Sequence, residues 1–391
     1  MIVYITAQGS KVVKEGRHLL VKSDDGSVRT LFAYKLHQLV LCGNITLTPH
    51  ALRLLMYENV DTVFLRTDGR YVGRLSGSES KNVFLRRNQF RRIDDPVFVL
   101  KTARSIVEGK LTNQLRVLQR LKRTRNLPQI DKPIIALKNC IHRLSSFENL
   151  EQVRGIEGAG SAAFFQGYKS VFPQELGFQR RVRRPPTDPV NSVLSLLYTF
   201  LINRGYAAIR LVGLDPYPGF LHNLEYGRHS LPLDLIEEFR TILAETLTLA
   251  LFNLQVLKAD DFYVDKPILP QLNEKQDNAI EQACHDEIGA VSGTAAQVQE
   301  DAEEELFDLP DQRLGENGGE AGARSGKDAV RLHPAAFKKV ITAFEKKLQT
   351  EFFHSTAQKR MTYADALIFQ ARQLRQVIEG ETETYLPLLL K

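Results

Sequence analysis

The sequence predicts an α+β protein in which a small N-terminal β domain, a strand-rich sandwich, precedes a larger all-α domain. Residues 2–75 alternate between apolar and polar side chains in short runs that turn residues interrupt, which is typical of strands. From Pro96 almost to the end, apolar residues instead recur at helical spacing. The 391 residues, of which 43% are apolar, suffice for two packed domains.

Five alternating runs at the start of the chain are expected to be strands: IVYIT, KVVKE, HLLVK, VRTLFAY and HQLVLCG. The SDDG sequence at 23–26 predicts a hairpin turn between the third and the fourth run. A helix is predicted to start after Thr48, a capping residue that Pro49 follows at the first helical position. A second hairpin, with its turn at 67–70, completes a β domain that we place at residues 1–75.

Residues 76–95 are polar and basic, and we interpret them as a linker between the two domains. Two phenylalanines, Phe84 and Phe90, alternate there with four arginines: Arg86, Arg87, Arg91 and Arg92. Arginines bind phosphates and an aromatic ring stacks on an unpaired base, so the pattern favours DNA contact over a merely solvated linker. The helix predicted at 97–125 carries eight Lys and Arg, including Lys101 and Lys110, and Glu108 as its single acid; contact with phosphates is again favoured.

The helical domain, residues 96–391, contains an acidic, Gly-rich stretch at about 275–330 that lacks periodicity and is expected to be a mobile insertion. Residues 271–330 hold 15 acids and 4 Lys or Arg, a net charge of −11, so the rest of the chain carries +17. Such a high positive charge on the rest of the chain suggests a polyanionic partner, most simply nucleic acid. Three cysteines without a CxxC pair and the absence of a long apolar run or a signal peptide indicate a cytoplasmic protein without a membrane span.

One acid stands out in the helix predicted at Leu150–Tyr168, which is apolar nearly all round. Glu157 lies where Leu or Val would normally point, and an unpaired buried carboxylate costs several kcal/mol. Arg154, one turn earlier, could neutralise it. A divalent metal ion could do the same, and the spacing alone leaves both open.

A second group of polar residues follows at Gly213–Arg240, where His222 ends a Pro- and Gly-rich turn. The helix that starts at about Leu233 has four acids on one arc and Arg240 nearby: Asp234, Glu237, Glu238 and Glu245. This face is either a solvated acidic surface or half of a metal site. Spacing alone does not separate Glu237 from Glu238 as the metal ligand.

Between these segments lies a second basic run, which contains Arg181, Arg183 and Arg184. Asp188 and Pro189 are predicted to cap and open the next helix, and Asn191 in its first turn is a capping candidate.

Four motifs together resemble the CRISPR adaptation integrase family, the universal CRISPR-associated protein one. They are RGIEGAGSAAFF (Arg154–Phe165), RRPPTDPVNSVLSLLYTFL (Arg183–Leu201), GLDPYPGFLH (Gly213–His222) and SLPLDLIEEFR (Ser230–Arg240). The resemblance extends from the N-terminal strands to the closing QARQLRQVIEGETETYLPL (Gln370–Leu388), and only the acidic insertion has no counterpart.

The resemblance implies a catalytic helical domain in which Glu157, His222 and Glu237 hold Mg²⁺ or Mn²⁺, with Asp234 as an accessory carboxylate and Asn191 supplying a hydrogen bond near the site. Zinc is disfavoured because thiolate ligands are lacking. The implied reaction is attack of a DNA 3′-hydroxyl on a phosphodiester at the boundary of a repeat; with water in its place the result is cleavage. The residues expected to hold the DNA backbone are Arg154, Arg240, Arg86, Arg87, Arg91, Arg92, Lys101, Arg181, Arg183 and Arg184.

The implied partners are double-stranded and branched DNA, a second copy of the chain that pairs through the β domain, and the small companion CRISPR-associated protein two. Two alternatives remain open. The first is a non-catalytic basic scaffold that binds DNA, in which Arg154 neutralises Glu157; the second is a repair nuclease that acts on branched DNA.

Overall fold

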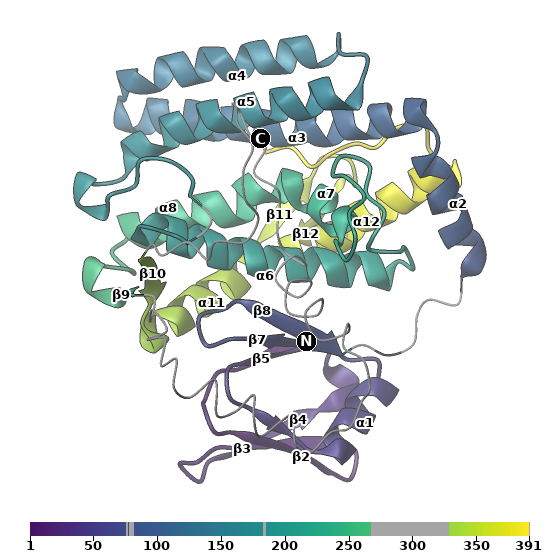
Figure 1. The fold of residues 1–391 in the computed structure, drawn as a ribbon, viewed down its shortest axis with the longest axis vertical. Helices are drawn as coiled ribbons and strands as arrows, with labels where there is room; N and C mark the ends of the chain where they lie inside the picture. The colour runs from purple at the N-terminus through teal and green to yellow at the C-terminus, as the bar shows by residue number, and fades with distance from the viewer. Residues whose placement is uncertain (76, 78–81, 183–184, 267–327, 391) are drawn as a thin grey trace, which may run out of the picture.

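The computed structural model describes residues 1–75, 77, 82–182, 185–266 and 328–390, and Figure 1 shows a strand-rich N-terminal part below a larger helical part. The predicted α+β class is therefore confirmed. No helix within the described ranges is long and apolar enough to cross a membrane. The insertion expected at 275–330 lies outside the described residues except for its last three positions.

The N-terminal part consists of two four-stranded sheets. The first has the order β1-β5-β7-β8 and contains β1 (Ile2–Ile5), β5 (Gln38–Cys42), β7 (Asp61–Leu65) and β8 (Tyr71–Leu75). The second has the order β4-β3-β2-β6 and contains β4 (Val28–Phe32), β3 (His18–Lys22), β2 (Lys11–Glu15) and β6 (Thr46–Leu47). Helix α1 (Pro49–Tyr57) starts as predicted, with the Thr48 side chain accepting a hydrogen bond from the Ala51 N–H.

Strand β5 is buried on both faces, and its alternation divides the protein into two cores. Leu39 and Leu41 face the core of the N-terminal part, whereas Val40 and Cys42 join the core of the helical part. The first sheet thus lies between the two cores, with one face packed against the helical part. Polar contacts across the junction include the hydroxyl of Tyr4, which donates to Glu345 at 3.0 Å.

In the residues that the structure describes, the helical part consists mainly of nine α-helices: α2 (Val83–Ile93), α3 (Pro96–Arg125), α4 (Asp131–Leu144), α5 (Leu150–Tyr168), α6 (Pro189–Leu211), α7 (Ser230–Phe239), α8 (Thr246–Asn253), α11 (Pro334–Leu348) and α12 (Tyr363–Glu379). Figure 1 shows α3, α4 and α5 as an upper layer above α6, α7 and α8. A π-helical segment, Arg240–Glu245, joins α7 to α8. The predicted cap Asp188 accepts the expected backbone hydrogen bond, and Thr362 caps α12 in the same way.

Within the described residues, two short two-stranded antiparallel sheets interrupt the part that we expected to be helical almost throughout. They pair β9 (Phe262–Asp265) with β10 (Ala329–Leu332) and β11 (Glu351–His354) with β12 (Lys359–Thr362). Residues 329–332 are a strand rather than the start of the following helix. The reason is that Pro334 disfavours a helical His333, whose ψ is 153°, so α11 begins only at the proline.

The segment interpreted as a linker contains α2, which packs on the loop that leads to His222. Arg86 pairs with Asp215 at 2.7 Å, and the side chain of Gln89 donates to the carbonyl of Asp215 at 2.9 Å. This helix therefore supports the site from outside and leaves Arg87 and Arg91 exposed.

Candidate functional site

Helix α5 carries Glu157 close to α3 because a glycine lets the two helices approach. A Cβ on Gly160 would lie 2.4 Å from the Leu111 side chain of α3, so no larger residue fits without movement. Val153 and Phe164 of α5 are also fully buried. Lys110, the neighbour of Leu111, therefore reaches Glu157 across the contact between α3 and α5.

Every residue of α7 and of the π-helical segment is buried, so the interpretation of a solvated acidic face is wrong. Asp234, Glu237, Glu238 and Glu245 all lie inside, and each has its own partners. The burial of four acids is tolerated because each one accepts hydrogen bonds or pairs with a cation. Without such partners, burying each carboxylate would cost several kcal/mol of folding free energy.

Asp234 organises the turn that presents His222. It accepts from the backbone N–H groups of Phe220, Leu221 and His222 at 2.5, 2.9 and 3.0 Å. It also lies 2.6 Å from Nδ1 of His222, and because a carboxylate only accepts, Nδ1 carries the proton. Nε2 is then the nitrogen left to bind a metal ion, and it lies 3.8 Å from Glu237 Oε1. This geometry supports the accessory role of Asp234.

Glu237 lies between two cations, at 3.0 Å from Arg240 and 2.7 Å from Lys110. Burial alone would raise the pKa of Glu237, but the charges of Arg240 and then of Lys110 outweigh it and lower the pKa to about 2. Arg240 is itself fixed by Tyr198, whose ring centroid lies 5.0 Å from the guanidinium. Glu237 is thus an ionised, buried carboxylate.

Glu157 completes the group. Its carboxylate binds Lys110 and accepts from the Ser161 hydroxyl at 2.9 Å. Burial would raise the pKa of Glu157, yet Lys110 more than compensates and the pKa is lowered. Within the described ranges, no three His, Cys, Asp or Glu side chains are arranged to hold a metal ion directly. The two glutamates share one ammonium group instead.

Lys110 is the site residue that the sequence reasoning missed. We grouped it with the surface bases of the helix at 97–125, but its side chain is 6% exposed. A signal was present, because Lys110 lies one turn after Ile106 and Val107 and beside Leu111, all three of which are buried. Its place on the apolar arc predicts burial and hence an acidic partner.

Arg154 does not neutralise Glu157, so the premise of the scaffold alternative is wrong. The guanidinium of Arg154 pairs with Glu151 at 2.6 Å and donates to the carbonyl of Leu221 at 2.7 Å. Arg154 and Arg240 are both buried, which contradicts the expectation that they hold the DNA backbone. Arg154 instead fixes the turn beside His222.

Asn191 and Arg181 form a separate polar cluster at the start of α6. Asn191 accepts from Arg181 and from the Val182 N–H, each at 2.9 Å, and donates to Asp188 at 2.5 Å. Arg181 also donates to the Ser195 hydroxyl at 3.0 Å. Asn191 therefore anchors the chain that precedes α6, and its contacts do not reach Glu157. Arg181 is engaged inside the protein rather than exposed for DNA.

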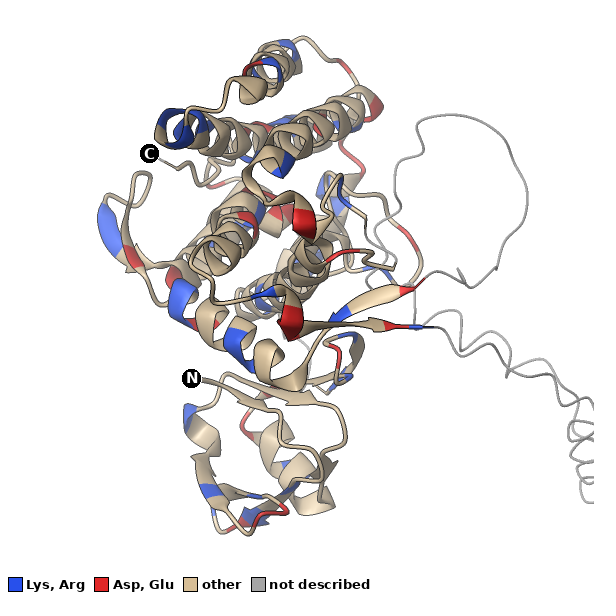
Figure 2. Ribbon diagram, turned by 90° about the vertical axis from the view of Figure 1, so that its left-hand side faces the viewer, with Lys and Arg blue, Asp and Glu red and all other residues tan. Residues whose placement is uncertain are grey.

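The remaining basic residues differ in exposure. Lys101, Arg87 and Arg91 are exposed, while Arg86 and Arg92 are partly covered. Arg183 and Arg184 lie outside the described residues. In Figure 2, Lys and Arg occur on helices and strands of both parts, with acids among them. Exposed candidates for phosphate contact thus remain on α2 and at the start of α3.

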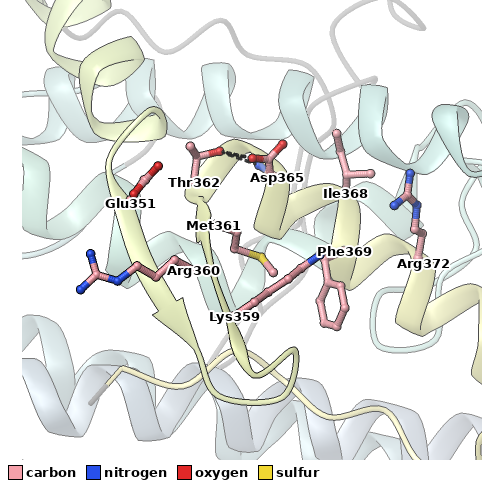
Figure 3. A pocket seen from close by; sticks show the side chains of 9 residues that line it. All are labelled: Glu351, Lys359, Arg360, Met361, Thr362, Asp365, Ile368, Phe369 and Arg372. Carbon is pink, nitrogen blue, oxygen red and sulfur yellow. Dashed lines mark hydrogen bonds between the residues drawn. The ribbon is translucent and has the colours of Figure 1, made fainter.

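A pocket of about 350 Å³ lies elsewhere, between the β11–β12 hairpin and α12 (Figure 3). Thr362 donates to Asp365 at 2.8 Å at one side of it, and Lys359 and Arg372 add opposite charge. No residue of the Glu157 group lines this pocket, so the chemistry of the four motifs is not located there.

His229, immediately before α7, makes stability depend on pH. Burial, and then the charge of Arg74, lower the pKa of His229 to about 4. The unfolded chain binds this proton near pH 6.5 and the folded chain does not, so stability falls as pH drops from 6.5 towards 4, by about 2 kcal/mol at pH 5 from this residue. Urea unfolding at pH 7.5 and pH 5 should show a smaller loss for His229→Phe, which keeps a ring between Tyr206 and Tyr217. An equal loss of stability in wild type and in His229→Phe would contradict the assignment of this pH dependence to His229.

Comparison with known proteins gives one consistent result. The sequence model of the family described as CRISPR associated protein Cas1 matches residues 3–284. The CRISPR-associated endonuclease Cas1 3 of Thermus thermophilus is 29% identical over 394 residues, covering 100% of this chain and 97% of that protein.

Two solved structures share the fold. A CAS1 protein from Thermotoga maritima has a TM-score of 0.70 and 17% identity, with 97% of each chain covered. A chain of a Cas6-RT-Cas1--Cas2 complex has a TM-score of 0.75 and 22% identity, covering 100% of this chain and 36% of that one. The strand-rich part followed by a helical part is thus an arrangement that both neighbours have.

Proposed function

Since the chain belongs to the CRISPR associated protein Cas1 family, we propose that it is a metal-dependent DNA endonuclease and integrase of CRISPR spacer acquisition. It joins 3′-hydroxyl ends of foreign DNA fragments to the repeat array by transesterification. The resemblance predicted from the four motifs is thereby confirmed, and the endonuclease name of the full-length relative supports the enzymatic assignment.

One observation carries the proposal: Glu157 of α5 and Glu237 of α7 both bind a single buried cation, the Lys110 ammonium, and Nε2 of His222 lies 3.8 Å from Glu237. Positive charge is therefore already stabilised at this point. Two ionised carboxylates and an imidazole whose Nε2 lies 3.8 Å from one of them are a donor set that suits Mn²⁺ or Mg²⁺. These residues fit a divalent metal ion that would take the position of the Lys110 ammonium group.

Each residue of the site would then have a distinct role. Glu157, His222 and Glu237 would hold the ion, Asp234 keeps the proton of His222 on Nδ1, and Arg240 keeps Glu237 ionised. A bound divalent ion supplies polarisation of the scissile phosphodiester and stabilisation of the leaving oxygen. A DNA 3′-hydroxyl forms the new P–O bond as the old 3′-oxygen leaves, so no nucleotide cofactor is consumed; water in place of that hydroxyl gives cleavage.

The proposal includes three partners: double-stranded or branched DNA, a second copy of the chain, and the companion CRISPR-associated protein two. The exposed bases of α2 and Lys101 support DNA contact, with Arg87 lying 5.5 Å from the ring centroid of Phe84. One structural neighbour is a chain of a complex whose title names Cas2, which supports the companion protein. The N-terminal sheets are the proposed dimer contact.

An integration assay tests the function. Purified protein, a DNA fragment with free 3′-hydroxyl ends and a repeat-bearing plasmid are mixed with Mn²⁺ or Mg²⁺, with and without the companion protein. We expect joining at the repeat boundary that depends on the companion, and its complete loss in EDTA. Binding without any joining or cutting favours the scaffold alternative, whereas metal-dependent cutting of branched DNA without preference for the repeat favours a repair nuclease.

A further inference from the structure

The last part of the chain crosses two helices of the site as an extended segment. Residues 385–390 form neither helix nor strand, and Figure 1 draws them as a yellow trace beside α3. We call them the C-terminal segment. Tyr385 and Leu388 are nevertheless buried, at 3% and 2% exposure, so the segment is part of the core rather than a loose end.

Glu238 of α7 is the main anchor of this segment. Its carboxylate accepts from the Leu388 N–H at 2.9 Å, from the Tyr385 hydroxyl at 3.0 Å and from the Gln370 side chain at 2.8 Å. Gln370 also donates to the carbonyl of Leu386 at 3.0 Å. Glu238 is 1% exposed, and within the described residues its carboxylate is bonded by α12 and by the C-terminal segment. This separates it from Glu237, which faces the cations.

Asn113 of α3 is the second anchor. Its amide donates to the carbonyls of Leu388 and Glu238 at 2.8 and 2.9 Å, and its oxygen accepts from the Leu390 N–H at 2.8 Å. The segment passes so close to α3 that a Cβ on Gly109 would lie 2.4 Å from Pro387. One side chain thus bonds α3, α7 and the chain end together.

These anchors lie directly behind the site. Glu238 follows Glu237 on α7, and Asn113 lies one turn after Lys110 on α3, so the segment joins the two helices whose side chains meet as the Glu237–Lys110 pair. Without the segment, buried acceptors on Glu238 and Asn113 would lose their partners, which costs about 1–3 kcal/mol for each group.

We propose that the C-terminal segment is a positioning element of the site: by bonding Glu238 and Asn113 it holds α7 against α3 and so fixes where Glu237 stands. Its effect on the reaction rests on the proposed function, but its effect on α7 does not. Glu238 and Asn113 are positioning residues, since neither touches the Glu157 group.

A pair of substitutions at one position isolates the hydrogen bond. Leu388→Pro removes both the N–H that Glu238 accepts and the buried side chain, whereas Leu388→Ala removes only the side chain. We expect hydrogen–deuterium exchange of the α7 amides to accelerate about tenfold in Leu388→Pro relative to Leu388→Ala at a temperature where both are folded. Joining at saturating DNA should slow about tenfold in Leu388→Pro, while the Kd for DNA stays within about twofold, because geometry and not binding is lost.

A second pair of substitutions, at Glu238, tests the same hydrogen bonds without a proline and so covers the case in which Leu388→Pro misfolds. Glu238→Gln keeps one acceptor oxygen and the shape of the side chain, so it should restore part of the α7 protection that Glu238→Ala loses. Equal exchange and equal joining in Leu388→Pro and Leu388→Ala, with Glu238→Ala like wild type, would overturn the proposal. If the α7 protection changes as expected but wild type never joins DNA, the positioning role stands and the proposed function fails.

Discussion

Glu157→Ala is expected to reduce metal-dependent cleavage and joining by about 10³-fold, because an electrostatic contact at the reacting centre is typically worth that much. Glu157 supplies one of the two carboxylates at the Lys110 ammonium and does not face the exposed bases of α2. The affinity for branched DNA should therefore stay within about twofold of wild type. Strand cleavage and joining in Mn²⁺, with DNA affinity measured by fluorescence anisotropy, check both parts.

The matched control is Glu148→Ala, which removes an exposed acid just before the same helix and should leave both quantities unchanged. A circular-dichroism melt of each variant excludes simple unfolding. Activity of Glu157→Ala equal to that of wild type would remove Glu157 from the catalytic assignment.

Lys110→Met is expected to destabilise the metal-free protein by about 3 kcal/mol, because it leaves two buried carboxylates with one cation fewer. Methionine has a similar length and no charge, so most of the packing is kept. Mn²⁺ should then raise the Tm of Lys110→Met more than that of wild type, since the ion no longer competes with an ammonium group for Glu157 and Glu237. Thermal melts with Mn²⁺ and with EDTA measure this.

Lys138→Met, an exposed lysine on α4, serves as the control and should melt like wild type in both conditions. The idea that the ammonium occupies the place of the metal fails if Mn²⁺ raises the Tm of Lys110→Met no more than that of wild type. That outcome would leave the ligand set without support from stability.

Local signals in the sequence predicted most of the elements. The strands of the N-terminal part alternate between apolar and polar residues, and Thr48 before Pro49 predicted the start of α1. The nearly continuous apolar character of Leu150–Tyr168 predicted a buried helix with a conspicuous acid, and α5 has the same bounds. These features are local, so a window of a few turns contains the information.

Spacing along the sequence led to wrong predictions where it did not show which partner or surroundings a side chain has. Arg154 lies at helical distance from both Glu151 and Glu157, and only the position of the Leu221 carbonyl turns it towards Glu151. The acids of α7 look like a solvated face because a window of sequence does not show that α3, α6 and α12 cover every side of that helix.

The sequence by itself determined the fold class, the helix that buries Glu157 and the turn that ends at His222. Only the tertiary structure decided that Lys110 is the cation between Glu157 and Glu237, and that Glu238 faces the chain end instead. The physical reason is that these choices depend on contacts between residues far apart in the chain, such as Lys110 and Glu157, 47 positions apart, or Glu238 and Leu388, 150 positions apart. Periodicity specifies which face of a helix is apolar, whereas packing specifies what that face meets.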